Sequence, residues 1–72
     1  MKTTEVRAMA ELYATGTRMV KGRIWAWQGI NIHRISVVWG KIEVESTCLT
    51  TIRVFETINE LQQFFELVEE EM

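Results

Sequence analysis

The sequence lacks most of the side chains from which catalytic and metal sites are built. It has no aspartate, one histidine and one cysteine among its 72 residues. A nucleophilic triad needs a nucleophile beside a base that an acid orients, and a closed zinc site needs about four ligands at paired spacings. The four glycines stand singly, so no phosphate-binding loop is present. We therefore expect no enzymatic activity, no metal and no cofactor.

Other absences bear on redox state and on domain organisation. A single cysteine, Cys48, cannot form an internal disulfide, which fits a reducing compartment. Without proline, low-complexity tracts or a fixed repeat, residues 1–72 are predicted to form one domain. No apolar run approaches the roughly 18 residues of a membrane span, and the first residues lack the apolar block of a secretion signal. We expect a cytoplasmic protein that does not engage membranes.

Acidic side chains are absent from residues 12–42, a stretch that contains five basic residues and all three tryptophans. Residues 43–72 carry eight glutamates and one arginine, a net charge of −7. The overall charge of −2 therefore conceals a strong separation of sign. Such a separation indicates either a surface offered to an outside partner or two halves that pair with each other.

The chain is short for a domain that must stabilise itself. A domain of this size buries only about 60% of the surface of its unfolded chain, so burial barely exceeds the conformational entropy lost on folding. Disulfides and metals are not expected to help, while 47% of the residues are hydrophobic. We therefore expect a homo-oligomer, most simply a dimer, which covers the apolar side chains that one core cannot absorb.

A C-terminal helix is predicted to begin at Thr57, because Thr57 and Glu60 have the spacing of a capping box. Apolar residues then recur at steps of three and four, and Phe64 and Leu67 widen the stripe that they form. The stripe itself consists of Ile58, Leu61, Phe65, Val68 and Met72. The three glutamates at residues 69–71 stand where the helix dipole prefers cations, which predicts basic groups nearby in the same chain or in a neighbour.

The rest of the chain predicts one further helix and several strands. A helix is expected over residues 4–15, closed by Gly16 in a left-handed conformation. From there the apolar period falls to two, with turns expected at residues 28–29 and 40–41 and a β-bulge near Arg34, where the alternation shifts. A helix, an antiparallel meander of three or four strands and an amphipathic C-terminal helix together predict an α+β two-layer domain.

Three single residues carry structural expectations. Trp39 continues the face of Ile35 and Val37, so it is predicted to lie in the core. Cys48 is expected to be a small buried apolar residue rather than a reactive thiol. His33 is expected to be a structural strand residue rather than a ligand or a base.

The apolar surplus and the lack of a catalytic set favour a protein-interaction domain, which associates with itself and, as a further option, binds or inhibits a larger protein. The acidic helix face would either be merely solvated or imitate a row of phosphates. The residues assigned to this interface come from one strand and from the C-terminal helix: Trp25, Trp27, Phe64, Glu66, Leu67 and Glu70.

An alternative function is the binding of single-stranded nucleic acid. Residues 23–27 place Arg23, Trp25 and Trp27 on one face of a strand, with Arg18 and Lys21 shortly before it. Tryptophans on a sheet face can stack unpaired bases, and basic side chains beside them can follow the phosphates. Tight binding of duplex nucleic acid is not expected, because a pI near 5.3 does not suit the basic footprint that duplexes require.

Overall fold

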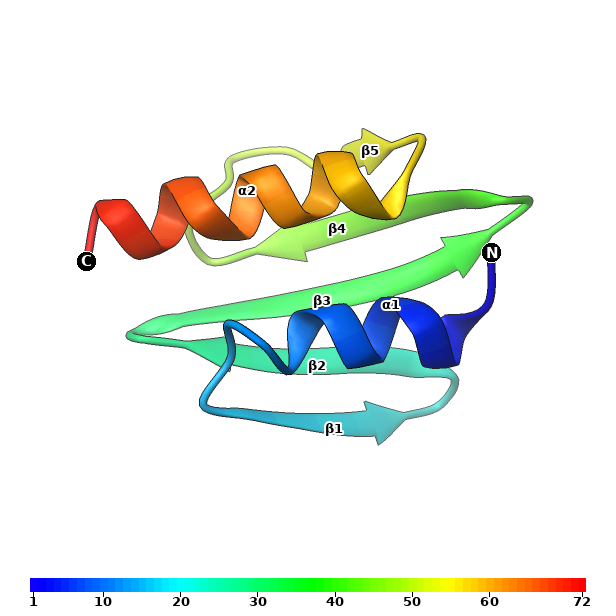
Figure 1. Ribbon diagram of the computed structural model, residues 1–72, viewed down its shortest axis with the longest axis horizontal. Helices are drawn as coiled ribbons and strands as arrows, with labels where there is room; N and C mark the ends of the chain where they lie inside the picture. The colour runs from blue at the N-terminus through cyan, green and yellow to red at the C-terminus, as the bar shows by residue number, and fades with distance from the viewer.

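A computed structural model describes all 72 residues. They form two layers, with both helices packed on the same face of one antiparallel sheet (Figure 1). The strands follow one another in space as they do in sequence, so the sheet is a simple meander. This confirms the predicted α+β class, but the sheet has five strands rather than three or four. The elements are α1 (Thr3–Ala10), β1 (Gly16–Val20), β2 (Arg23–Gln28), β3 (Asn31–Val38), β4 (Lys41–Ser46), β5 (Arg53–Phe55) and α2 (Ile58–Glu70).

The extra strand, β1, begins where the sequence predicted a helix end. Helix α1 stops at Ala10, five residues earlier than expected, and Gly16 opens a strand instead of adopting a left-handed conformation. The chain already contacts the sheet just before β1, where the Thr15 backbone N–H donates to the Trp27 carbonyl oxygen at 2.7 Å. Pairing with β2 then satisfies the backbone of β1, which outweighs continuation of a short helix.

The predicted β-bulge near Arg34 is wrong, because β3 pairs without interruption with both β2 and β4. The apparent shift of period has a different origin. Ile30 is 95% exposed in the β2–β3 turn, and Ile32 lies on the uncovered face, so neither belongs to the core pattern. The buried positions of β3 are His33 and Ile35, which keep a regular alternation.

Two hairpin turns place a side chain in the left-handed region just before a glycine. These turns are Lys21-Gly22, with φ of 51° and 79°, and Trp39-Gly40, with φ of 53° and 72°. Positive φ at both central residues is the type I′ geometry that matches the twist of the strands. A hairpin was expected at residues 40–41, one residue later than the structure has it, and the prediction that Trp39 lies in the core is wrong. As the first residue of that turn it is 96% exposed.

Helix α2 is fixed at its start by Thr57 and along its length by the core. The Glu60 backbone N–H donates to the Thr57 hydroxyl at 3.1 Å, as the capping box predicts. The Glu60 carboxylate accepts from the Glu56 backbone N–H instead of that of Thr57, so the reciprocal bond is shifted by one residue. The core between the layers comprises Val6, Met9, Ala10, Ile24, Ala26, Ile35, Ile42, Val44, Phe55, Leu61, Phe64, Phe65 and Val68.

Neither helix combines the length and the apolar character that crossing a bilayer requires.

The turn at Trp39 yields a test of backbone strain. Replacing Trp39 by Asn creates the Asn-Gly pair that type I′ turns favour, and it should raise the free energy of unfolding by about 0.5–1 kcal/mol. Urea denaturation measures this change. Ile30→Asn is the matched control, since it also removes an exposed apolar turn residue but at a position without positive φ. A destabilised Trp39→Asn protein would contradict the strain argument.

Candidate functional site

The face of the sheet away from the helices, called the open face below, is not covered by any other element. Alternate residues of every strand point to it, and in β2 to β5 their neighbours in sequence include the core residues of the sheet. The strand registers identify its members as Arg18, Val20, Arg23, Trp25, Trp27, Ile32, Arg34, Ser36, Val38, Lys41, Glu43, Glu45 and Val54.

A row of aromatic and charged side chains crosses the middle of the open face. The pairing places Arg18 beside Trp25, Trp25 beside Arg34, and Arg34 beside Glu45, from β1 to β4. The Arg34 guanidinium carbon lies 5.6 Å from the centre of the Trp25 ring, a distance typical of a cation–π contact. Trp27 extends the aromatic surface, with its ring centre 6.3 Å from that of Trp25 and the rings inclined by 40°. Both indoles are half-buried.

The open face carries more positive than negative charge. It contains four basic side chains and two acidic ones. Glu45 pairs with Arg34 at 2.7 Å and more loosely with Arg23 at 3.6 Å, whereas Arg18 and the neighbouring turn residue Lys21 form no ion pair. Exposed pairs of this kind contribute about 0–1 kcal/mol each and exchange partners easily. The arginines therefore remain available to an anionic partner.

Helix α2, in the other layer, carries the opposite charge. Its thirteen residues include four glutamates and no basic residue. The glutamates of its last turns form no ion pair within the chain, so the prediction that basic groups of the same chain lie near them is wrong. The alternative in a neighbouring chain stays untested. Glu66 instead accepts a hydrogen bond from the Tyr13 hydroxyl at 3.0 Å. The separation of charge along the sequence thus becomes, in large part, a separation between two faces.

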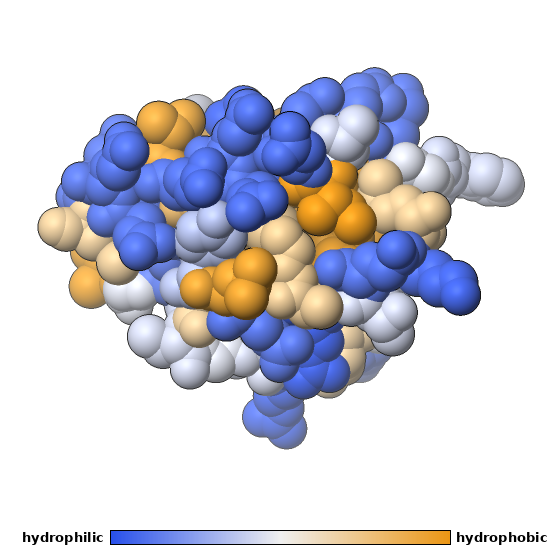
Figure 2. All heavy atoms as spheres, in the orientation of Figure 1, coloured by the Kyte–Doolittle hydropathy of each residue, from blue (hydrophilic) through white to orange (hydrophobic).

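The interface predicted from the sequence is divided by this arrangement. Trp25 and Trp27 lie on the open face, whereas Glu66, Leu67 and Glu70 lie on the outside of α2, in the other layer. Leu67 is 57% exposed. The helix side of the molecule is largely hydrophilic, and its apolar patches are small and interrupted (Figure 2).

The assignment of Phe64 to the interface is wrong, because its side chain is only 5% exposed. Its ring lies 5.5 Å from that of Phe55 and 5.4 Å from that of His33, both in the core. The apolar stripe of α2 is therefore buried within its own domain. In the middle turns of α2, Leu67 is the only large apolar side chain that points outward.

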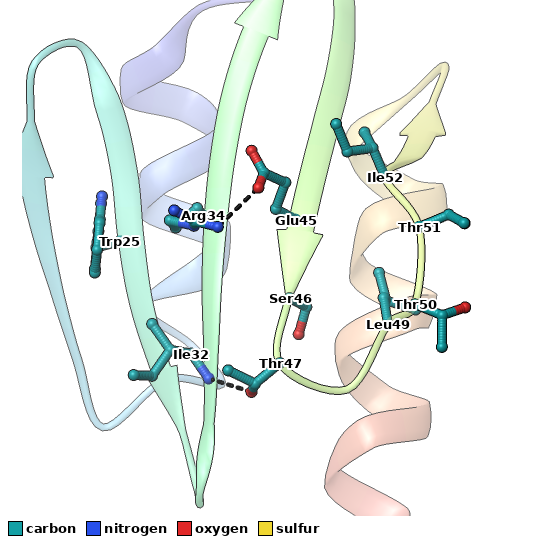
Figure 3. Close-up of a pocket in the computed structure, with 10 residues that line it drawn as sticks. All are labelled: Trp25, Ile32, Arg34, Glu45, Ser46, Thr47, Leu49, Thr50, Thr51 and Ile52. Atoms are coloured by element: carbon teal, nitrogen blue, oxygen red, sulfur yellow. Dashed lines mark hydrogen bonds and ion pairs between the residues drawn. The ribbon is translucent and has the colours of Figure 1, made fainter.

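A groove of about 420 Å³ lies on the open face between the tryptophan strand and the segment that joins β4 to β5. Figure 3 shows Trp25 and Ile32 on one side, Leu49 to Ile52 on the other, and the joined pair of Arg34 and Glu45 between the two sides. Ser46 and Thr47 complete the lining. Sequence reasoning missed Arg34 and Glu45 as site residues. The available signal was the alternation along each strand, which puts Arg34 and Glu45 on the same face of the sheet as Trp25. Their pairing depends on the register between the strands, for which the sequence has no local signal.

A buried polar chain runs beneath one end of this groove. Gln28 Nε2 donates to the Phe65 carbonyl oxygen at 2.8 Å, which turns Gln28 Oε1 toward His33 Nε2 at 2.9 Å. Because that oxygen can only accept, His33 carries its proton on Nε2 and accepts from the Ser46 hydroxyl through Nδ1 at 2.7 Å. His33 is thus a core residue of the strand, as expected.

Cys48, which was predicted to be buried, is exposed in the segment after β4. Its Sγ lies 3.1 Å from Ser46 Oγ, and its backbone N–H donates to the same oxygen at 3.3 Å. The next residue, Leu49, packs against the core instead.

The chain matches no protein family model, no curated protein and no solved structure.

Burial of His33 predicts a dependence of stability on pH. Desolvation lowers the pKa of His33 from 6.5 to about 4. Between these two pH values the imidazole is protonated in the unfolded chain but stays neutral in the folded protein. The stabilisation is complete above pH 6.5 and is lost as the pH falls toward 4. Between pH 7 and pH 5 the free energy of unfolding should fall by about 2 kcal/mol.

Urea denaturation at the two pH values measures this loss. The His33→Gln variant serves as the comparison, since it lacks the imidazole and should show a much smaller difference between pH 7 and pH 5. An equal difference in both proteins would mean that other groups cause the pH dependence.

Proposed function

We propose that the protein binds single-stranded nucleic acid through the open face. The observation that carries the proposal is the row Arg18, Trp25 and Arg34, with Trp27 beside it, on a surface that no other element covers. Indole and guanidinium planes both stack on unpaired bases, and base–aromatic stacking contributes about 1–3 kcal/mol per base.

Charge supports the same partner. The basic side chains lie on the face that bears the tryptophans, while the glutamates of α2 lie in the opposite layer. A polyanion is therefore attracted to one face and repelled by the other, which orients it before contact. Burial of Phe64 removes much of the helix surface on which the case for protein association rested. For these reasons nucleic acid, the alternative from the sequence, becomes the favoured partner.

Removal of the stacking surface should weaken binding. In fluorescence anisotropy with a labelled single strand of about 12 nucleotides, within the usual site sizes, Trp25→Ala should raise the Kd about tenfold or more. Trp39→Ala is the matched control, since Trp39 is an exposed tryptophan in the β3–β4 turn, and it should bind like the parent protein.

Salt provides a second measure in the same experiment. Three phosphate contacts, for example by Arg18, Lys21 and Arg23, should weaken binding on the order of twentyfold between 50 and 200 mM salt. Circular dichroism checks that each variant is folded. Equal affinities of the Trp25→Ala and Trp39→Ala proteins, or no binding by the parent, would overturn the proposal.

Self-association is a second candidate, favoured by the apolar share of the same surface. Beside the two tryptophans, the open face presents Val20, Ile32, Val38 and Val54. Two copies that meet through this face could bury enough area for a stable dimer, for which about 800 Å² per partner is usual. Such a dimer would be the homo-oligomer expected from the small size of the chain.

The two candidates respond to salt in opposite ways. Four basic and two acidic side chains on the open face repel the same face of a second copy, and salt screens that repulsion. Sedimentation velocity should therefore show more dimer at 500 mM than at 50 mM salt, on the order of a few-fold in the dissociation constant. A protein that stays monomeric at every salt and protein concentration would exclude self-association and leave nucleic-acid binding in place.

A further inference from the structure

The groove beside Trp25 has the size and the mixed character of a site for a small planar group. Its volume of about 420 Å³ falls within the range of small-molecule sites. Apolar walls come from Trp25, Ile32, Leu49 and Ile52, while Arg34 and Glu45 lie together between these walls (Figure 3). A flat aromatic heterocycle whose edge carries hydrogen-bonding groups suits such a lining better than a purely apolar or a purely ionic ligand.

The Arg34–Glu45 pair still has free hydrogen-bonding capacity. A carboxylate accepts about four hydrogen bonds and a guanidinium donates five, yet one bond, from Arg34 Nη2 to Glu45 Oε2 at 2.7 Å, joins them. Arg23 approaches Glu45 Oε1 at 3.6 Å, which is an ion pair but too long for a hydrogen bond. Both side chains are accessible, with 43% of Arg34 and 36% of Glu45 exposed. A ligand edge with adjacent donors and an acceptor would use the remaining positions.

Among the bases, guanine offers that pattern. Its Watson–Crick edge has two neighbouring donors, N1–H and the N2 amino group, followed by the acceptor O6. Adenine and cytosine each place an acceptor beside their amino group, and uracil or thymine has one donor between two acceptors. A carboxylate therefore pairs with two guanine donors at once, while the adjacent guanidinium reaches O6. Charged partners make such hydrogen bonds stronger than neutral ones.

We propose that the groove takes up one guanine base, with Glu45 accepting from N1–H and N2–H and Arg34 donating to O6. This inference rests on the proposed binding of single strands and adds a base preference to it. The base stacks on the Trp25 side of the groove, because aromatic planes stack on bases, and Arg34 meets its edge.

Oligonucleotides that differ in one base test the base preference. A single strand with one central guanine should bind about tenfold more tightly than the same strand with adenine there. Inosine keeps N1–H and O6 but lacks the N2 amino group, so its strand should fall between the two. An excess of free guanosine, which carries no phosphate, distinguishes a free nucleoside from a base within a strand. If it abolishes binding of the guanine strand, the groove holds the base without help from phosphates.

The variant Glu45→Gln should lose the preference for guanine, because the amide keeps only one acceptor oxygen and places an NH2 donor where the second carboxylate oxygen would accept from the base edge. Glu43→Gln is the matched control. Glu43 lies two residues away on the same strand and the same face but does not line the groove. Both substitutions remove one negative charge from the open face, so both should strengthen binding of the adenine strand to a similar degree.

Only the loss of discrimination is specific to Glu45. Equal affinity of the parent protein for the guanine, inosine and adenine strands would overturn the guanine site while leaving single-strand binding intact. A Glu45→Gln protein that keeps a tenfold preference would overturn the assigned role of Glu45. Absence of binding to any strand would remove both proposals together.

Discussion

The structure depends on one geometric constraint, which is that both helices cover the same face of the sheet. Because side chains alternate along a strand, this arrangement sends alternate residues of β2 to β5 into the core and leaves the others on the open face. Ile24 and Ala26 are fully buried while their neighbours Trp25 and Trp27 are not. The open face is therefore a direct consequence of how the core is built, and its residues are not needed to fill that core.

The core itself is closed by a polar connection as well as by apolar packing. Gln28 at the end of β2 binds the Phe65 carbonyl oxygen in α2, and through His33 it reaches Ser46 at the end of β4. No buried side-chain polar atom is left without a partner. Since an unsatisfied buried group costs about 1–3 kcal/mol, this chain of bonds strongly favours one position of α2 along the sheet. The same chain ends at Ser46, which lines the groove.

The sequence predicted the elements whose signals are local and missed those that depend on pairing. Thr57 and the apolar period placed α2 correctly, and alternation correctly put Arg23, Trp25 and Trp27 on one face. Trp39 was placed wrongly because it continues the alternation of Ile35 and Val37, which point into the core. The pairing of Val38 with Lys41 puts Trp39 in the turn instead, and the sequence of β3 alone does not show that pairing. Phe64 was assigned outward because the width of the helix stripe that the sheet would cover was unknown. The groove depends on the strand register and on the path of residues 47–52, and neither has a local signal.

The distribution of charge then decides what kind of contact the open face can make. In water an isolated pair such as Arg34 and Glu45 is stabilised by at most about 1 kcal/mol, so it does not hold the fold together. On a surface that also carries Arg18, Arg23 and Lys41, one carboxylate lowers the attraction for phosphate without reversing it. A face built only for phosphates would gain by losing Glu45. If the open face binds a single strand as proposed, the position of Glu45 beside Trp25 and Arg34 fits a role in choosing which base is held rather than in how strongly the strand is held.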